Sequence, residues 1–527
     1  MTFHDHSPRV VWPAPGLPAL LEGEARRIEF IIAHTETGLD PLFNWARRLA
    51  LRDRRQRQRV ELAINYLEPL ERSAVSKLAR RFAELPEAQH LRFARLVAHT
   101  PPGLSPAPPR SSCVLDVMVG DAVERSNAVG ILAPRARLAL AFASDLHVAA
   151  FWQIMGEAVS RFAPDLAPKF LHPGRLLDRF IDQANRLGAR GDLDLVILGG
   201  DLVDHVHPHA SRVSHAGETN VARLVEALSR LEVPAIVLPG NHDHRSFPWR
   251  PRLPGLGAVG IPAGRSSRIL RDAGLWDPWP VRPSDRHNLR TEDETGRPGL
   301  AYHLALLAPA TDFHLTVRGM QLVFASTGRD VLPRWREVEW SRLGFVLRSL
   351  RSSWEDPDCE GFTDAQLAAM AGALDGTRGA ALFFHAPLLN PHPHEPVEKR
   401  LARLDPGDRD DPAAQIAFER RLFATGLRRG VVFRNVGPLI RMLASHRHPL
   451  AVFSGHVHRS SAIAFARISL RLRSTPFAPP HAADQTVSLL TAPALGHVRF
   501  PGSEPPGYLL ASFEDGRLAA LERRPVG

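Results

Sequence analysis

The stretch Leu238-Pro239-Gly240-Asn241-His242-Asp243 decides how the rest of the chain is interpreted. It follows an apolar run, Val233 to Leu238, that is typical of a short buried strand, and its Pro-Gly pair predicts a turn. An Asn, a His and an Asp are therefore expected in a loop at the end of a strand, where α/β proteins carry their chemistry. Taken alone, these residues would equally suit an ordinary polar turn, so the interpretation depends on the other strand ends.

Length and composition point to a multidomain globular protein. A chain of 527 residues favours two or more domains, and contents of 44% hydrophobic and 23% charged residues are ordinary for such proteins. The net charge of +10 is compatible with nucleic acid, a membrane surface or acidic substrates as partners. Because the arginines are spread along the whole chain, we attribute the charge to compositional bias. The short basic cluster from Arg52 to Arg57 is expected to be a solvated helix face.

Cysteine content and hydropathy limit the location of the protein. Cys113 and Cys359 are too far apart in sequence to indicate a disulfide framework or a zinc site. Residues 1–16 contain no apolar segment of the signal-peptide type, and no apolar run is long enough to span a membrane. A cytoplasmic enzyme without a membrane partner is expected, with export by another route left open. The oligomeric state stays unknown.

Residues 1–134 differ in pattern from the remainder and contain no chemical motif. We expect a β-rich accessory domain with helical insertions that packs on a catalytic domain or shapes access to it. Strands are predicted at Arg27–His34, Arg59–Tyr66, Cys113–Val119 and Asn127–Ala133. Helices are predicted at Leu42–Leu51, Ser73–Leu85 and Gln89–Val97.

Residues 135–527 are expected to form the catalytic domain, with an irregular insertion at about 247–313. Strands alternate with helices, and several strands end in acidic or histidine residues, which is typical of an α/β sheet whose site lies at the strand ends. The predicted strands are 137–143, 194–198, 233–238, 320–326, 379–384, 450–453 and 487–490, followed by a hairpin of 508–513 and 517–522. The predicted helices are 173–188, 218–231, 363–374, 413–423 and 436–444.

Five strand ends carry residues of the kind that bind metal ions, namely Asp145 and His147, Asp201, Asn241, His385, and His456 with His458. Residues i and i+2 of an extended segment point the same way, so each of the two spaced pairs can aim both side chains into one cleft. Mixed Asp, Asn and His ligands suit transition metals such as Mn, Fe or Zn. Seven ligands are too many for one ion and suit two ions with a bridging carboxylate.

The series Asp145-x-His147, Gly200-Asp201, Gly240-Asn241-His242-Asp243, His385 and Gly455-His456-x-His458 resembles the calcineurin-like metallophosphoesterases. The resemblance covers roughly residue 135 to the C-terminus and implies a four-layer α/β/β/α sandwich of two mixed sheets with a dinuclear metal centre. It implies that Asp145, His147 and His458 hold one ion, and that Asn241, His385 and His456 hold the other. Asp201 would bridge the two ions. His242 would assist the leaving group, and Asp243 would orient the His242 ring.

The expected function is that of a metal-dependent hydrolase that cleaves phosphoester bonds with a metal-bound hydroxide. The substrate would be a phosphodiester or phosphomonoester of a small molecule or nucleotide, and the run from Asn241 to Arg245 is similar to the cyclic-nucleotide phosphodiesterase branch. His244 and Arg245 are candidates for substrate contact, whereas His205, His207, His209 and Arg329 also suit ordinary loop positions. Two alternatives stay open: a nuclease of the same superfamily, and a non-catalytic binding module on the same fold. Nucleic acid is the less expected partner, because the sequence lacks an aromatic and basic groove pattern.

Overall fold

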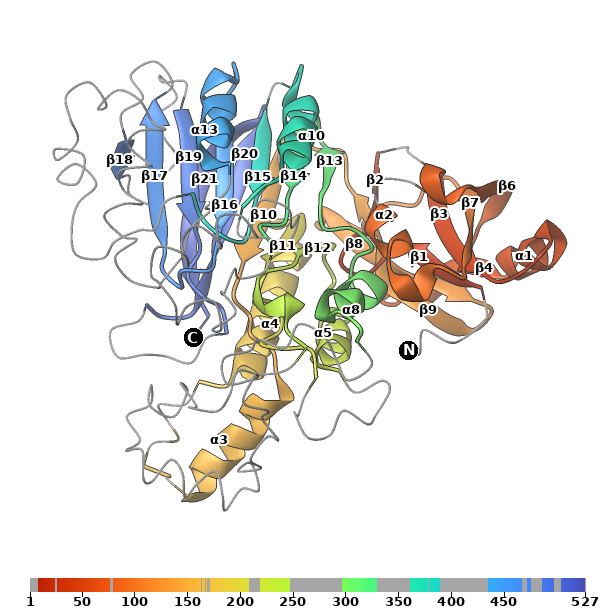
Figure 1. The fold of residues 1–527 in the computed structure, drawn as a ribbon, viewed down its shortest axis with the longest axis horizontal. Coiled ribbons are helices and arrows are strands. Elements are labelled where there is room, and N and C mark those ends of the chain that lie inside the picture. The colour runs from red at the N-terminus through yellow and green to blue at the C-terminus, as the bar shows by residue number, and fades with distance from the viewer. Residues whose placement is uncertain are drawn as a thin grey trace, which may run out of the picture.

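A computed structural model describes residues 8–23, 26–75, 79–162, 164–165, 167, 171–207, 219–246, 296–328, 361–377, 379–388, 435–466, 472–474, 486–496 and 504–526. Four sheets are present in these residues: two in the N-terminal region and two in the remainder (Figure 1). Some expectations lie outside the described residues. These are the helix predicted at 413–423, residues 247–295 of the insertion, Cys359, His209 and Arg329.

The first central sheet has the strand order β12-β11-β10-β20-β21. Its parallel strands are β10 (Leu138–Ala143), β11 (Leu195–Gly199) and β12 (Ala235–Leu238), all completely buried. The hairpin of β20 (Gly507–Glu514) and β21 (Arg517–Pro525) adds two antiparallel strands beside β10. The strands predicted in these five segments are therefore confirmed, and the sheet is mixed.

The second central sheet has the order β13-β14-β15-β16-β19-β17-β18. Its parallel strands are β14 (Met320–Phe324), β15 (Ala380–Phe383), β16 (Leu450–Ser454) and β19 (Thr486–Thr491). Antiparallel strands complete both edges: β13 (Phe313–Val317), β17 (Ser461–Ala466) and β18 (Leu472–Ser474). The sequence did not predict β13, β17 or β18.

Aromatic side chains hold the two central sheets face to face. The ring of Phe142 on β10 lies 5.9 Å from that of Phe383 and 5.4 Å from that of Phe453 on the second sheet. Helices α4 (Pro173–Arg190) and α5 (Asn220–Leu228) share a core with the first sheet, and α10 (Asp364–Leu374) and α13 (Val436–Ser445) with the second. The predicted α/β architecture with helices around two mixed sheets is confirmed.

Sequence signals explain where these helices begin and end. The Thr363 hydroxyl accepts a hydrogen bond from the Gln366 amide, and the Gln366 side chain accepts one from the Thr363 amide, which is a capping box. Thr219 caps α5 in the simpler way, through the Ala222 amide. Helix α4 ends at Gly191, whose φ of 77° is a conformation that favours glycine.

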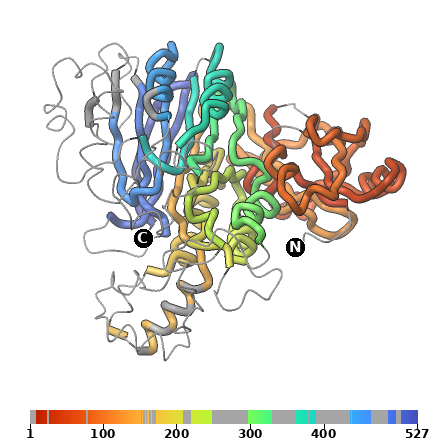
Figure 2. Tube along the Cα trace, viewed as in Figure 1, coloured from red at the N-terminus to blue at the C-terminus, as the bar shows by residue number. Residues whose placement is uncertain are grey.

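The N-terminal region contains two further sheets, with orders β1-β3-β7-β6 and β2-β9-β8-β4-β5. It lies to one side of the central sheets, in red and orange (Figure 2). The first sheet consists of β1 (Arg9–Trp12), β3 (Arg27–His34), β6 (Ala63–Leu70) and β7 (Arg92–His99). The second consists of β2 (Ala19–Glu22), β4 (Leu49–Asp53), β5 (Gln58–Glu61), β8 (Ser112–Val119) and β9 (Ala122–Leu132). The β-rich character expected of this region is confirmed.

Several local predictions in this region are wrong. The helix predicted at Gln89–Val97 is largely strand β7, which pairs with β3 along its whole length. Its Phe93 joins one hydrophobic core while Leu96 joins another, so burial on both faces hides the alternation of a strand. The helix predicted at Leu42–Leu51 is α1 (Leu39–Ala46), which ends before β4 begins.

The segment from Arg52 to Arg57 is also not a helix face. It is the end of β4 and the turn into β5, where Arg52 and Arg54 form ion pairs with the buried carboxylate of Asp116. The single strand predicted at Arg59–Tyr66 is divided between β5 and β6. Of the helix predicted at Ser73–Leu85, the described residues show two short pieces, η1 (Arg72–Ala74) and α2 (Arg80–Ala83).

Helix α8 (Gly299–Leu306) corrects the expectation that residues up to 313 are irregular. Its apolar face shares a core with Val75 and Phe82 of the N-terminal region. Its first residue, Gly299, lies so close to the backbone of His244 that an added Cβ would be 2.7 Å from the His244 carbonyl oxygen. The helix therefore connects the N-terminal region to the loop that carries Asn241 and His242.

Within the residues that the structure describes, no helix is both long and apolar enough to cross a membrane.

Candidate metal centre

The loops that follow the parallel strands of both central sheets meet at one edge of the sandwich. The first sheet brings Asp145 and His147 after β10, Asp201 after β11 and Asn241 after β12. The second sheet brings His385 after β15, and His456 with His458 after β16. Because carboxyl ends of parallel strands lie side by side, residues far apart in sequence are brought together here. The contacts below join all seven predicted ligands.

The first cluster consists of Asp145, His147 and His458, whose ligand atoms all lie within 4.8 Å of one another. His458 Nε2 is 3.2 Å from Asp145 Oδ1 and 3.3 Å from His147 Nε2. Two imidazole nitrogens that face each other repel unless a proton or a cation lies between them. The donor set of this cluster therefore suits a cation.

The second cluster consists of Asp201, His385 and His456, with Asn241 beside them. His385 Nε2 lies 3.2 Å from Asp201 Oδ1, 3.0 Å from Asn241 Oδ1 and 3.1 Å from His456 Nδ1. The other nitrogen, Nδ1, is 2.9 Å from the Gly199 carbonyl and donates to it. That bond fixes the ring and leaves Nε2 directed at the cluster, as is usual for metal-ligating histidines.

Asp201 belongs to the second cluster and also faces His147 of the first, with which it forms a further group that includes His242. Its Oδ1 is 3.2 Å from His385 Nε2, and its Oδ2 is 3.8 Å from His147 Nε2 and 3.7 Å from His242 Nε2. Its side chain is fully buried between these rings. One carboxylate therefore faces ligands of both clusters, which is the arrangement that two neighbouring cations require.

The backbone at the candidate ligands is strained. A positive φ, between 48° and 69°, occurs at Asp145, His147, Asp201, His456 and His458. This conformation is uncommon for residues other than glycine and clusters at functional sites. Gly200 and Gly455 precede two of these residues, and a Cβ at Gly200 would lie 2.6 Å from His385 Nδ1. Glycine is needed there because the loops approach each other too closely for a side chain.

Burial and opposite charges compete in setting the pKa values of the site. Burial alone would raise the pKa of Asp201, but His242 and His385 hold it well below its usual range. Burial would lower the pKa of His385, but Asp201 raises it to about 10. In His147, Asp204 and Asp201 outweigh burial and raise the pKa. Without metal, Asp201 is ionised and the rings of His385 and His147 attract protons, so a metal ion has to displace protons to bind there.

The predicted role of Asp243 is corrected by its contacts. The Asp243 carboxylate accepts hydrogen bonds from three backbone amides. Its Oδ1 accepts from Leu202 at 3.1 Å and from Val203 at 3.0 Å, and its Oδ2 accepts from Gly240 at 2.7 Å. The acid that meets the ring of His242 is Asp204, whose Oδ1 is 2.8 Å from His242 Nδ1. Sequence reasoning missed Asp204 as a site residue, although it lies three positions after Asp201 in the same loop.

Two other neighbours of the site become clear from the structure. Arg245 lies against the imidazole of His242, with its Nη1 2.7 Å from each ring nitrogen. Asn220, completely buried at the start of α5, accepts from the Ala150 amide at 3.0 Å and donates to the His205 carbonyl at 2.7 Å. It thereby ties the segment after His147 to the loop after Asp204. His244 is buried, and its backbone carbonyl lies against Gly299 at the start of α8.

Comparison with known proteins agrees with this geometry. Residues 138–303 match the family model of the calcineurin-like phosphoesterases. This segment, less than half of the chain, is similar to the calcineurin-like phosphoesterases. The matched segment contains Asp145, His147, Asp201, Asn241 and His242. His385, His456 and His458 lie beyond it and join the site through the second sheet. No curated protein sequence matches the chain.

Several solved structures are similar to this chain at low identity. A purple acid phosphatase, PPD1 from yellow lupin (Lupinus luteus) seeds, is 10% identical with a TM-score of 0.41, covering 98% of this chain and 72% of its own. A dimetal phosphatase from Danio rerio is 13% identical with a TM-score of 0.35, covering 74% and 96% respectively. The structure of PhoD is 10% identical with a TM-score of 0.37, covering 98% and 86%.

Proposed function

We propose that this protein is a metal-dependent hydrolase of phosphoester bonds that holds two divalent ions at the strand ends. The observation that supports the proposal most directly is the arrangement of the seven predicted ligands in two clusters that Asp201 links. The substrate would be a phosphodiester or a phosphomonoester of a small molecule or nucleotide. We also infer that residues 1–134 form an accessory domain and residues 135–527 the catalytic domain.

The residues fit the metal ions that this proposal requires. Asp145, His147 and His458 would hold one ion, and Asn241, His385 and His456 would hold the other, with Asp201 between them. Asp145 Oδ1 is buried and lies 3.2 Å from His458 Nε2, another predicted ligand of the same ion, as expected of two donors that face one cation. Ions in these positions would supply a Lewis acid for the phosphoryl oxygens and activate water at neutral pH. The mixed oxygen and imidazole donors suit Mn, Fe or Zn.

His242 is the residue that we assign to proton transfer. Its Nδ1 faces Asp204, while its Nε2 faces the clusters, 3.7 Å from Asp201 Oδ2. An imidazole held in this way can donate a proton from Nε2 to the leaving oxygen of the ester, and Asp204 stabilises the protonated ring. Arg245, which lies against the same ring, adds a cation that can bind a phosphoryl oxygen.

The test compares metal content and hydrolysis in matched variants. We expect the wild-type protein, loaded with Mn²⁺, to hydrolyse bis-p-nitrophenyl phosphate or p-nitrophenyl phosphate. His242→Ala should keep its metal and lose most turnover, whereas Asp201→Ala should lose metal. His314→Ala, an exposed histidine on β13, serves as the control and should behave as wild type. Equal metal content and equal activity in all four proteins would reject the assignment.

A further inference from the structure

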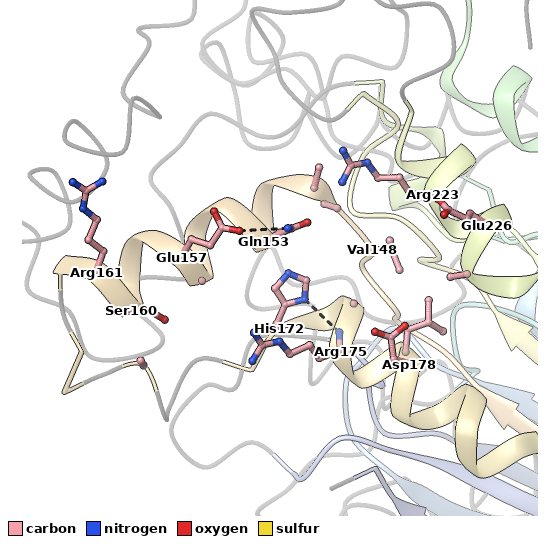
Figure 3. Close-up of a pocket in the computed structure, with 17 residues that line it drawn as sticks. Val148, Gln153, Glu157, Ser160, Arg161, His172, Arg175, Asp178, Arg223 and Glu226 are labelled. Carbon is pink, nitrogen blue, oxygen red and sulfur yellow. Dashed lines mark hydrogen bonds between the residues drawn. The ribbon is translucent and has the colours of Figure 1, made fainter. Parts of the chain in front are cut away.

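A cavity of about 810 Å³ lies beside the candidate metal centre. One wall is helix α3 (Ala150–Phe162), and the opposite wall is formed by the first turns of α4 and by α5 (Figure 3). Cavities of roughly 300–1,000 Å³ typically bind small organic molecules. The volume therefore suits a ligand of about nucleotide size.

Part of the cavity lining follows the predicted metal ligand His147 directly in the sequence. Val148, Ala149 and Ala150, the three residues after His147, line the cavity with small side chains. The Val148 amide donates to the Leu202 carbonyl at 3.0 Å, which fixes this segment against the loop that carries Asp201. None of the seven predicted ligands lines the cavity. It is thus a compartment adjoining the metal centre rather than the centre itself.

Two arginines face this cavity without a protein counterion. Arg175 on α4 and Arg223 on α5 line it, and within the described part of the chain neither guanidinium has a hydrogen-bond or ion-pair partner. The nearby Asp178 forms an ion pair with Arg230, which lies outside the lining. Asp178 is therefore paired with Arg230 rather than with either lining arginine, and the two arginines are left to an external anion.

His172 contributes a neutral polar wall between these groups. Its Nδ1 accepts from the Arg175 amide at 3.3 Å, which leaves the hydrogen on Nε2, and Nε2 has no hydrogen-bond partner among the described residues. Burial and then the charge of Arg175 lower the pKa of His172. The start of α4 adds a partial positive charge on the same side. The Nε2–H donor and the start of α4 both favour an acceptor-rich group near Arg175.

Acidic residues limit how much negative charge the ligand can carry. Glu157 on α3 accepts from Gln153 at 3.3 Å and Glu226 follows Arg223 by one turn of α5, so both carboxylates also border the cavity. They would repel a polyanion that filled the whole volume. A ligand with one anionic group at the arginines and an uncharged, polar remainder fits this distribution.

We propose that this cavity binds the organic arm of a phosphoester substrate, and that the arm ends in an anionic group held by Arg175 and Arg223. This inference rests on the proposed phosphoester hydrolysis and adds the substrate class: an ester whose organic part carries a carboxylate or a second phosphate. The scissile phosphate would lie at the strand ends, while the arm would pass over Val148 and Ala149. Specificity would then be set by α3, α4 and α5.

The test uses p-nitrophenyl alkyl phosphate diesters of increasing chain length, each made with and without a terminal carboxylate. The Mn²⁺-loaded wild type is expected to show an about tenfold lower KM for the carboxylate form at one or more chain lengths, with similar kcat. Arg175→Ala and Arg223→Ala should remove this difference while leaving hydrolysis of the plain alkyl diesters unchanged. Arg179→Ala, an exposed arginine of α4 outside the lining, is the matched control and should keep the difference.

The experiment distinguishes a wrong cavity proposal from a wrong hydrolase proposal. If the wild type hydrolyses both series with equal KM at every chain length, the cavity proposal is wrong and the hydrolase proposal stands. If neither the diesters nor p-nitrophenyl phosphate is hydrolysed, the hydrolase proposal fails, and equilibrium titration with the carboxylate diesters tests the cavity separately. Tighter binding to wild type than to Arg223→Ala would then support it, and equal binding would overturn it. The same titration with terminal-phosphate diesters distinguishes the two kinds of anion.

Discussion

Replacing Asp204 by Asn separates the two acids that are candidates for positioning His242. Asp204 Oδ1 lies 2.8 Å from His242 Nδ1 and 3.4 Å from His147 Nδ1, so one carboxylate oxygen contacts a ring on each side. Asn has nearly the same shape but no charge. It either turns its oxygen to one ring or presents an NH₂ group that cannot accept from either ring. The change therefore removes the charged acceptor while leaving the packing almost intact.

The expected loss follows from the strength of that contact. A hydrogen bond to a charged partner contributes about 1.5–3 kcal/mol. If the bond is strongest when His242 is protonated, its loss lowers kcat by about 10- to 150-fold, since each 1.36 kcal/mol is about tenfold in rate. His147 loses a neighbour that orients it as well, and loss of such a contact weakens metal binding by about 10- to 100-fold. The measurement therefore needs excess metal, so that turnover reports on His242 alone.

Asp243→Asn is the contrasting variant. The Asp243 carboxylate accepts from three backbone amides, and an Asn side chain would place its NH₂ against at least one of them. A buried amide without an acceptor costs about 1–3 kcal/mol of unfolding free energy. We therefore expect a lower urea midpoint for Asp243→Asn, with a pH–rate profile shaped like that of the wild type.

The assay is hydrolysis of bis-p-nitrophenyl phosphate across pH at saturating Mn²⁺, together with urea unfolding of each protein. In Asp204→Asn, the ionised acid that favours protonated His242 is gone, so the limb of the profile that reports His242 should shift to lower pH. Wild-type kcat and an unshifted limb in Asp204→Asn, with a shifted limb in Asp243→Asn, would refute the reasoning and restore the role first expected of Asp243.

Two further expectations concern protons and support of the site. Because the pKa values of His385 and His147 are raised in the metal-free site, these rings hold protons that a metal ion must displace. The affinity for the metal ion should therefore rise with pH, and calorimetry in buffers of different ionisation enthalpy should detect proton release. A metal affinity that does not change with pH would contradict this. Asn220→Ala should lower the unfolding free energy by about 2–4 kcal/mol because it leaves a buried amide and a buried carbonyl without partners, and it should lower kcat more than KM changes. Asn185→Ala, which removes a comparable pair of bonds at a more exposed position, is the control and should cost less; equal losses would argue against a special role for Asn220.

The central sheets were predictable because their strands are buried along their whole length. Strands β10, β11, β12, β15 and β16 are short apolar runs, and a Gly, Ser or His follows each of them within two residues. Parallel order then brings the loops after these strands to one edge of each sheet. The proximity of the seven predicted ligands thus follows from strand order, which is why residues 311 positions apart, such as His147 and His458, could be expected at one site.

The N-terminal region was harder because its pairing is set by distant partners. Strand β7 pairs with β3 and β6, which come from earlier parts of the chain, and its two faces enter different cores. A sequence of this kind carries no alternation, and its periodicity is compatible with a helix. Helix α8 was missed for a related reason: it is apolar around most of its circumference because it packs between the N-terminal core and the loop after β12.

The identity of the acid that meets His242 depends on the backbone after β12, and spacing alone does not reveal it. Residues His242–His244 form a turn of 3₁₀ helix, in which successive side chains are rotated by roughly 120°. Adjacent residues of such a turn cannot face the same side, so His242 is directed towards the clusters while Asp243 turns back to the amides of the neighbouring loop. An acid next to a histidine in sequence is therefore a poor candidate to hold its ring when the segment is helical. An acid on the adjacent strand loop, as Asp204 is here, can approach the ring directly.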